Sequence, residues 1–71
     1  MPRETLVEGK GRVTAVLPRS LFRIEFANGH QILGFLSRRL RQENPRIAIG
    51  DQVMVELSPF DFSKGRIVAK E

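Results

Sequence analysis

Apolar and polar residues alternate along much of this 71-residue chain, and this period of two is the feature that most restricts its fold. The alternation predicts short extended segments at residues 13–17, 22–26, 30–36, 52–57 and 66–70. Because successive side chains of a strand point to opposite faces, such segments read as half-buried β-strands. No stretch carries the longer repeat of an extended amphipathic helix. The sequence therefore predicts an all-β domain.

Two local signals separate these strands. The dipeptide Asn28-Gly29 lies between two extended segments and predicts a tight hairpin, since both residue types accept a positive φ. Ser37 is a suitable N-cap for a short helix over residues 38–43, which Pro45 would end. Only one or two helical turns fit into this space, so the helix needs tertiary support.

Five strands with one short helix between the third and fourth strands are the element order of an OB-fold barrel. An SH3-like barrel is the alternative, because it also uses five short strands and a turn such as Gly50-Asp51. Gly11 and Gly34 favour the OB-fold, since glycines let long strands bend or bulge at barrel corners. We predict a single OB-fold (S1-like) RNA-binding domain over residues 1–71, with residues 1–5 as a flexible N-terminus.

Composition narrows the possible functions. The chain has no cysteine and one histidine, so neither a disulfide nor a cysteine or histidine metal site is expected, and no cofactor is predicted. Its acidic residues are scattered and show no paired arrangement for acid–base catalysis. There is also no apolar run of membrane-spanning length and no secretory signal pattern. A non-enzymatic protein of the cytoplasm is expected.

The net charge of +4 is concentrated in one place. The nine residues from Arg38 to Arg46 carry three of these four charges, because four arginines stand there with one acid, Glu43. These arginines are Arg38, Arg39, Arg41 and Arg46. Arginine is suited to bidentate contacts with phosphate, which predicts an RNA-binding surface. The alternative is a solvated helix face that only improves solubility.

Four weaker candidates lie outside this cluster. Lys64 and Arg66 flank Gly65 near the expected binding face, and routine charge at a strand end explains them equally well. Arg23 should be exposed on its strand, where it could contact RNA or pair with an acid across the sheet. His30 is expected on the surface of the hairpin, where it could hydrogen-bond to RNA or to a protein.

Aromatic residues offer little surface for base stacking. Phe60 and Phe62 could stack on bases, but Phe62 is equally suited to closing one end of the barrel. The chain contains no tryptophan and no tyrosine, which argues against a general single-strand binder. Binding through phosphates and backbone shape is the expectation.

Several motifs resemble the bacterial translation initiation factor one family over about residues 9 to 68. They are Leu21-Phe22-Arg23-Ile24, Asn28-Gly29-His30, Arg46-Ile47 with Gly50-Asp51, and Ser58-Pro59-Phe60-Asp61 continuing through Ser63-Lys64-Gly65-Arg66-Ile67. The resemblance implies an OB barrel that binds the decoding region of the small ribosomal subunit and occupies the aminoacyl site. It also implies that tRNA is kept out, that initiation factors two and three and a ribosomal protein are partners, and that there is no catalysis.

The chain departs from the family pattern at four positions. Arg38 replaces a usual glycine, and Pro45 replaces a common isoleucine and removes a backbone donor. Phe35 stands where many members have histidine, and Ala69 where a larger side chain is common. These changes are typical of a divergent second copy or an organellar member, which would work in the stroma or matrix.

The sequence thus predicts a translation initiation factor that is monomeric when free and contacts RNA through Arg38, Arg39, Arg41, Arg46, Lys64, Arg66, Arg23 and His30. Two other functions remain open. One is a general single-stranded RNA-binding chaperone of the cold-shock type. The other is a small protein-interaction barrel whose basic face binds an acidic protein.

Overall fold

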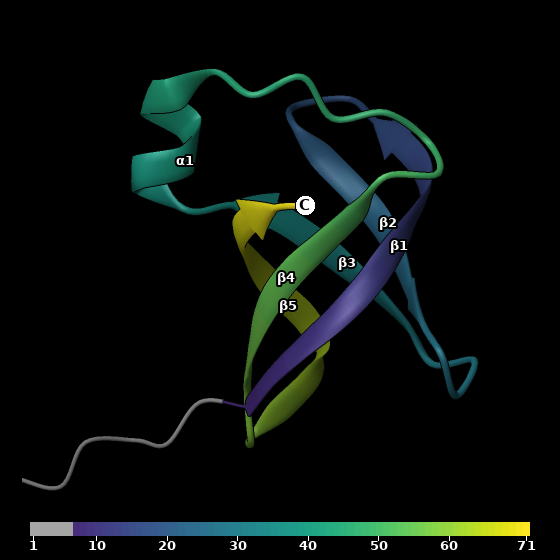
Figure 1. Cartoon of the computed structure of the whole chain (residues 1–71). Helices are drawn as coiled ribbons and strands as arrows, with labels where there is room; N and C mark the ends of the chain where they lie inside the picture. Colours follow the sequence, from purple (N-terminus) through teal and green to yellow (C-terminus); the bar gives the residue numbers. More distant parts are fainter. Residues whose placement is uncertain (1–6) are drawn as a thin grey trace, which may run out of the picture.

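The computed structural model describes residues 7–71, so the flexible segment predicted at residues 1–5 lies outside the described part (Figure 1). Five strands and one helix follow each other as β1 (Val7–Leu17), β2 (Leu21–Phe26), β3 (Gln31–Leu36), α1 (Arg38–Glu43), β4 (Gln52–Ser58) and β5 (Asp61–Lys70). The predicted helix has the observed bounds, and each predicted strand has a counterpart.

The strands form a closed barrel in the order β1-β2-β3-β5-β4. Neighbouring strands are antiparallel except β3 and β5, which run parallel, and β1 closes the barrel on β4. This is the predicted five-stranded OB-fold with one helix between β3 and β4, so the SH3-like alternative is wrong. Closure pairs both edges of the sheet formed by residues 7–71, which suits a small all-β chain.

The core consists of the inward positions of the alternating pattern. Ile24, Val53, Val55 and Ile67 are completely buried, whereas their chain neighbours face outward. The core as a whole comprises Val13, Phe22, Ile24, Ile32, Leu36, Leu40, Val53, Val55, Leu57 and Ile67. The predicted faces of the segments 22–26 and 52–57 are thereby confirmed, with Phe26 packed against the edge of the core.

Glycines permit the tight interior. A Cβ on Gly34 would lie 2.4 Å from Cδ1 of Ile24, and one on Gly65 would lie 2.4 Å from Cγ1 of Val55. The pairing of β2 with β3 continues through Gly34 without a register shift, so of the bend or bulge expected there, no bulge is found. Gly34 is required instead by close packing across the barrel. The register shifts occur in the β1–β2 pair, between Val13 and Ala15, and in the β4–β5 pair, where the extra residues lie on β5.

The β2–β3 hairpin forms where Asn28-Gly29 predicts it. The amide of Gly29 donates to the carbonyl of Phe26, and of the two residues only Gly29 has a positive φ, of 89°. This pattern is a three-residue loop, in which a type I turn is followed by a left-handed glycine. The predicted hairpin is thus confirmed, and Gly29 alone uses the positive φ that both residue types accept.

Strand β5 begins at Asp61, five residues before the predicted strand at 66–70. Ser63, Lys64 and Gly65 are frequent in turns, which is why the sequence pattern indicated a loop. Parallel pairing with β3, in which Leu33 faces Lys64 and Gly34 faces Gly65, holds this segment extended. Strand formation here depends on partners about 30 residues away and not on local preference.

Helix α1 begins and ends as the sequence predicts. The side chain of Ser37 accepts a hydrogen bond from the Leu40 amide at 3.1 Å, which is the N-cap contact. Asn44 ends the helix in the left-handed conformation with φ of 52°, directly before Pro45. Leu40 anchors the helix in the core. Figure 1 shows α1 where β3 finishes, at the opposite end of the barrel from the β2–β3 turn.

Candidate nucleic-acid interface

The structure divides the eight predicted contact residues into three sets. Four belong to α1 and the loop after it, and we call them the helix group: Arg38, Arg39, Arg41 and Arg46. Three lie on the outer face of the barrel strands, and we call them the strand group: Arg23, Lys64 and Arg66. His30 stands apart at the β2–β3 turn.

Helix geometry separates the three arginines of α1. Arg38 and Arg41 are three residues apart and therefore share a face. Arg39 lies on the other side of the helix, where its Nε atom is 3.6 Å from Oε2 of Glu43. Its side chain is 90% exposed, so this pair contributes little to stability. Glu43 nevertheless offsets part of the charge of Arg39, whereas Arg38 and Arg41 have no acid partner among the described residues.

Arg46 lies in the loop that leads from α1 to β4. The ammonium group of Lys70 donates to the Arg46 carbonyl and lies 3.4 Å from Oδ2 of Asp51. Asp51 also accepts a hydrogen bond from the Ala48 amide at 2.9 Å. This backbone hydrogen bond, helped by Lys70, lowers the pKa of the Asp51 carboxyl. The loop is thus held at several points while the Arg46 side chain remains exposed.

Pairing to the neighbouring strands brings the strand group together. Arg23 on β2 faces Leu33 on β3, and Leu33 faces Lys64 on β5. Arg66 faces Phe35 of β3 in the next outward row. Arg23 and Arg66 are 43 residues apart in sequence, yet these side chains share the outer face of β2, β3 and β5. In OB-folds the face of strands 2 and 3 is a common site for oligonucleotides.

One cation of each group lies in an ion pair with an acid. Arg66 Nη2 lies 3.2 Å from Oε1 of Glu56 on β4, which is half-buried. The ion pairs found within residues 7–71 are Lys10–Glu71, Arg39–Glu43, Arg66–Glu56 and Lys70–Asp51. Arg38, Arg41, Arg46, Arg23 and Lys64 belong to none of these pairs.

His30 is exposed at the β2–β3 turn, as predicted. Its Nε2 atom donates to the Phe62 carbonyl at 2.9 Å, and its ring stacks on Phe26 with 6.4 Å between the ring centroids. His30, Leu57 and Phe62 line one hollow, so Phe62 lies at the same end of the barrel as the β2–β3 turn. His30 thus connects the β2–β3 turn to β5 through the Phe62 carbonyl.

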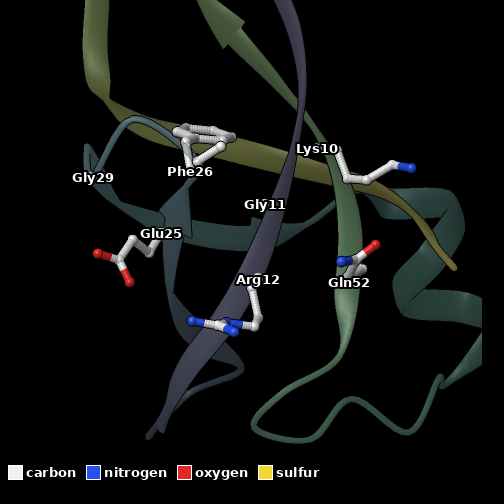
Figure 2. A pocket seen from close by; sticks show the side chains of 8 residues that line it. Lys10, Gly11, Arg12, Glu25, Phe26, Gly29 and Gln52 are labelled. Atoms are coloured by element: carbon white, nitrogen blue, oxygen red, sulfur yellow. The ribbon is translucent and has the colours of Figure 1, made fainter.

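Two further cations lie on the outer face of β1 and were not among the predicted contacts. Figure 2 shows Lys10 and Arg12 beside Gln52 of β4, with Glu25 and Phe26 of β2 on the other side. They border an open hollow of about 550 Å³. Alternation along β1 predicts that both side chains point outward. They were not selected because they lie far from the arginine cluster in the sequence.

The described part of the chain shows neither a metal-binding cluster nor a membrane-spanning helix. Residues 7–71 contain no group of three or more His, Asp or Glu side chains placed to hold a metal ion. Among the same residues, no helix is long and apolar enough to span a membrane.

Comparison with known proteins agrees with the geometry. The profile of the family described as Translation initiation factor 1A / IF-1 matches residues 1–71. The solution structure of translation initiation factor one from the Wolbachia endosymbiont strain TRS of Brugia malayi is similar, with a TM-score of 0.79 and 43% sequence identity. The match covers 96% of this chain and 80% of that one.

The crystal structure of YjeQ from Thermotoga maritima shares the fold, with a TM-score of 0.71 and 24% identity over 92% of this chain and 23% of that chain. At that identity the likeness concerns the fold alone. The family profile spans the whole sequence, and the 43% identical structure repeats the same barrel. The chain therefore belongs to the translation initiation factor 1A / IF-1 family, which is a family of initiation factors and not of enzymes.

Proposed function

We propose that this protein binds the small ribosomal subunit at its decoding region, occupies the aminoacyl site and keeps tRNA out during initiation. Initiation factors two and three are the partners that it supports there, together with a ribosomal protein. The observation that carries this proposal is the helix group, an exposed set of arginines on an OB barrel of the initiation factor family.

The chemistry of the helix group fits folded RNA. Arg38, Arg41 and Arg46 are exposed and lie in none of the ion pairs found within residues 7–71, so they are available for phosphate. Guanidinium groups bind phosphate oxygens in a bidentate manner. Each phosphate contact contributes about 0.7–0.9 to the slope of log affinity against log salt concentration. Three such contacts predict steeply salt-dependent binding.

The same proposal includes the cellular compartment and the oligomeric state of the protein. It acts without catalysis, as a monomer when free, in the bacterial cytoplasm or in the corresponding compartment of an organelle. Its basic surface then needs only one large polyanionic partner, the ribosomal RNA of the small subunit.

Binding of the purified protein to purified small ribosomal subunits across a salt series tests this function. A short unstructured RNA serves as the parallel probe, and a tRNA competing for the aminoacyl site tests the position. We expect tight, salt-sensitive binding to the subunit, weak binding to the short RNA, and mutual exclusion with the tRNA.

Two outcomes would favour the other functions. Equal affinity for the subunit and the short RNA would indicate a general chaperone of the cold-shock type. Binding to neither RNA, with a stable complex recovered without nucleic acid, would indicate a protein-interaction barrel.

A further inference from the structure

A hollow of about 350 Å³ lies at the end of the barrel that carries the β2–β3 turn, opposite α1 (Figure 1). Its lining residues are Phe26, Asn28, His30, Leu57 and Phe62. Phe62 is 46% exposed, and Phe60 on the adjoining β4–β5 turn is 81% exposed. We call the hollow together with Phe60 the apolar end. Accessible aromatic rings gathered beside a hollow are typical of a protein interaction site.

The hollow is formed in advance by packing and hydrogen bonding. The Phe26 ring lies close to the backbone of β1, since a Cβ on Gly9 or on Gly11 would lie 3.3 Å or 3.2 Å from it. His30 stacks on this ring with 6.4 Å between the ring centroids and hydrogen-bonds to the Phe62 carbonyl at 2.9 Å. A side chain that enters such a hollow gains apolar contact at little cost in ordering the protein.

Acids surround the apolar end. An acid directly precedes each lining residue that belongs to a strand, and these acids are Glu25, Glu56 and Asp61. Glu8 of β1 lies directly opposite Glu56 in the pair of β1 with β4. The segments that build this end, residues 7–9, 25–31 and 56–64, contain four acids and one lysine, a net charge of −3. The chain as a whole carries +4, so the two ends of the barrel differ in the sign of their charge.

Two of these acids are available to a partner. Glu8 and Glu25 belong to none of the ion pairs found within residues 7–71, whereas Glu56 pairs with Arg66 at 3.2 Å. Like charges directly opposite each other, as at Glu8 and Glu56, weaken a strand pair. A cation from a partner would relieve this repulsion, and an RNA phosphate would increase it.

We propose that the apolar end binds a basic segment of a protein, with one apolar side chain in the hollow and Lys or Arg side chains on the surrounding acids. A second copy of the chain fits this chemistry poorly. Two acidic ends repel each other, and Leu40, the apolar residue of the basic helix, is buried. Membership of the partner in an initiation complex rests on the function proposed above, but the site itself does not.

Selection from a random library of dodecamer peptides displayed on phage tests this chemistry. Peptides are selected on wild-type protein and then on the Phe62→Ser variant, which lacks the ring beside the hollow. We expect the peptides that depend on Phe62 to share one large apolar residue flanked by Lys or Arg. Val16→Ser is the matched control and should bind the same peptides, because Val16 is 51% exposed but lies near the other end of β1. A shared acidic motif, or no peptide that depends on Phe62, would overturn the proposal.

NMR titration of the isotope-labelled protein with one selected peptide locates and measures the binding. The signals of Phe26 and Leu57 should shift. Phe62→Ser should keep a native amide spectrum and bind about 10- to 100-fold more weakly, since one apolar contact is lost. The double variant Glu8→Gln and Glu25→Gln should bind several-fold more weakly and with less dependence on salt.

Three results of these titrations would contradict the proposal. One is a set of peptide-induced shifts confined to the helix group. Another is a shift of Phe26 and Leu57 on addition of a short RNA, which would make the apolar end an RNA site. The third is a shift of the same signals with protein concentration alone, which would indicate a second copy as the partner.

The peptide selection and the assay with small ribosomal subunits can fail separately. If wild-type protein does not bind the subunit, the proposed function fails, and the selection still decides the apolar end. If wild-type protein binds the subunit but no basic peptide depends on Phe62, the proposed function stands and this inference fails.

Discussion

The helix group and the strand group hold positive charge in different ways. The helix group lies within nine consecutive residues, on a six-residue helix and a loop that Leu40, Ser37 and Lys70 tie to the barrel. The strand group comes from β2 and β5, and barrel closure makes its members neighbours. The cations of the helix group are neighbours in the sequence, so they need few tertiary contacts to lie together. The cations of the strand group lie together only because the barrel is closed, so their positions are as fixed as the core beneath them.

The two groups also differ in their companions. One acid, Glu43, accompanies the helix group, and it pairs with Arg39. Glu56, Asp61 and the aromatic ring of Phe35 accompany the strand group. The helix group therefore has one exposed acid beside four arginines, whereas the strand group lies beside two carboxylates and an aromatic ring, so the two should respond differently to substitution.

Charge reversal in the helix group should have the largest effect. In the double variant Arg41→Glu and Arg46→Glu, two attractions to phosphate become repulsions, so affinity for the small subunit should fall by about 100-fold. The matched control reverses Lys10 and Arg12 on β1, with the same change in net charge. Equal losses in both variants would show that only net charge matters, and unchanged affinity in the folded Arg41/Arg46 variant would contradict the assignment of the helix group.

Disturbing the core beneath the strand group should be the next largest effect. In Gly65→Ala the new Cβ would lie 2.4 Å from Val55 Cγ1 and 2.8 Å from Ile32 Cδ1. Overpacking of this kind should lower the free energy of unfolding by about 1–3 kcal/mol, measured by urea denaturation. Gln42→Ala on the exposed side of α1 is the control and should change stability very little. If Gly65→Ala were as stable as the wild-type protein, the side chains around Gly65 would be able to move aside at little cost.

Removing the helix cap should affect the helix group alone. Ser37→Ala loses the hydrogen bond to the Leu40 amide, which costs about 1 kcal/mol in helices of this kind. Amide hydrogen exchange should quicken in α1 and stay unchanged in the strands, with a several-fold loss of subunit affinity. Ser37→Thr retains a capping hydroxyl and should restore both properties. A loss of protection spread over β1 to β5 would mean that the helix is an integral part of the barrel.

Low pH should reduce the stability of the protein, because the carboxyl groups of Asp51 and Asp61 each make a small contribution to it. The pKa values of Asp51 and Asp61 are lowered in the folded protein from an ordinary value of 3.8. Their contribution is complete above the unfolded pKa and is lost as the pH falls through the lowered folded pKa. Unfolding measured from pH 5 downward should therefore show stability that falls with pH. Asp51→Asn and Asp61→Asn should each flatten the curve, and an unchanged curve in both variants would contradict these contributions.

Much of the fold could be predicted because its signals are local. Alternation around Ile24 and Val55 identifies strands, and Ser37 and Pro45 bracket the helix. The start of β5 could not be predicted in this way, since Ser63 to Gly65 prefer turns and become extended only by pairing with β3. The function of Gly34 was equally hidden, because its contact with Ile24 lies across the barrel interior and not along the chain.

The candidate site divides along the same line. The helix group was visible as a cluster of arginines, but the pair between Arg66 and Glu56 and the apolar end were not. Apart from the start of β5, the sequence by itself determined where the strands lie, which of their side chains point outward and where the arginines gather, since these properties follow from neighbouring residues. Only the tertiary structure decided which outward side chains share a surface. The parallel pairing of β3 with β5 and the closure of β1 on β4 join segments about 30 or more residues apart, and no local preference specifies such partners.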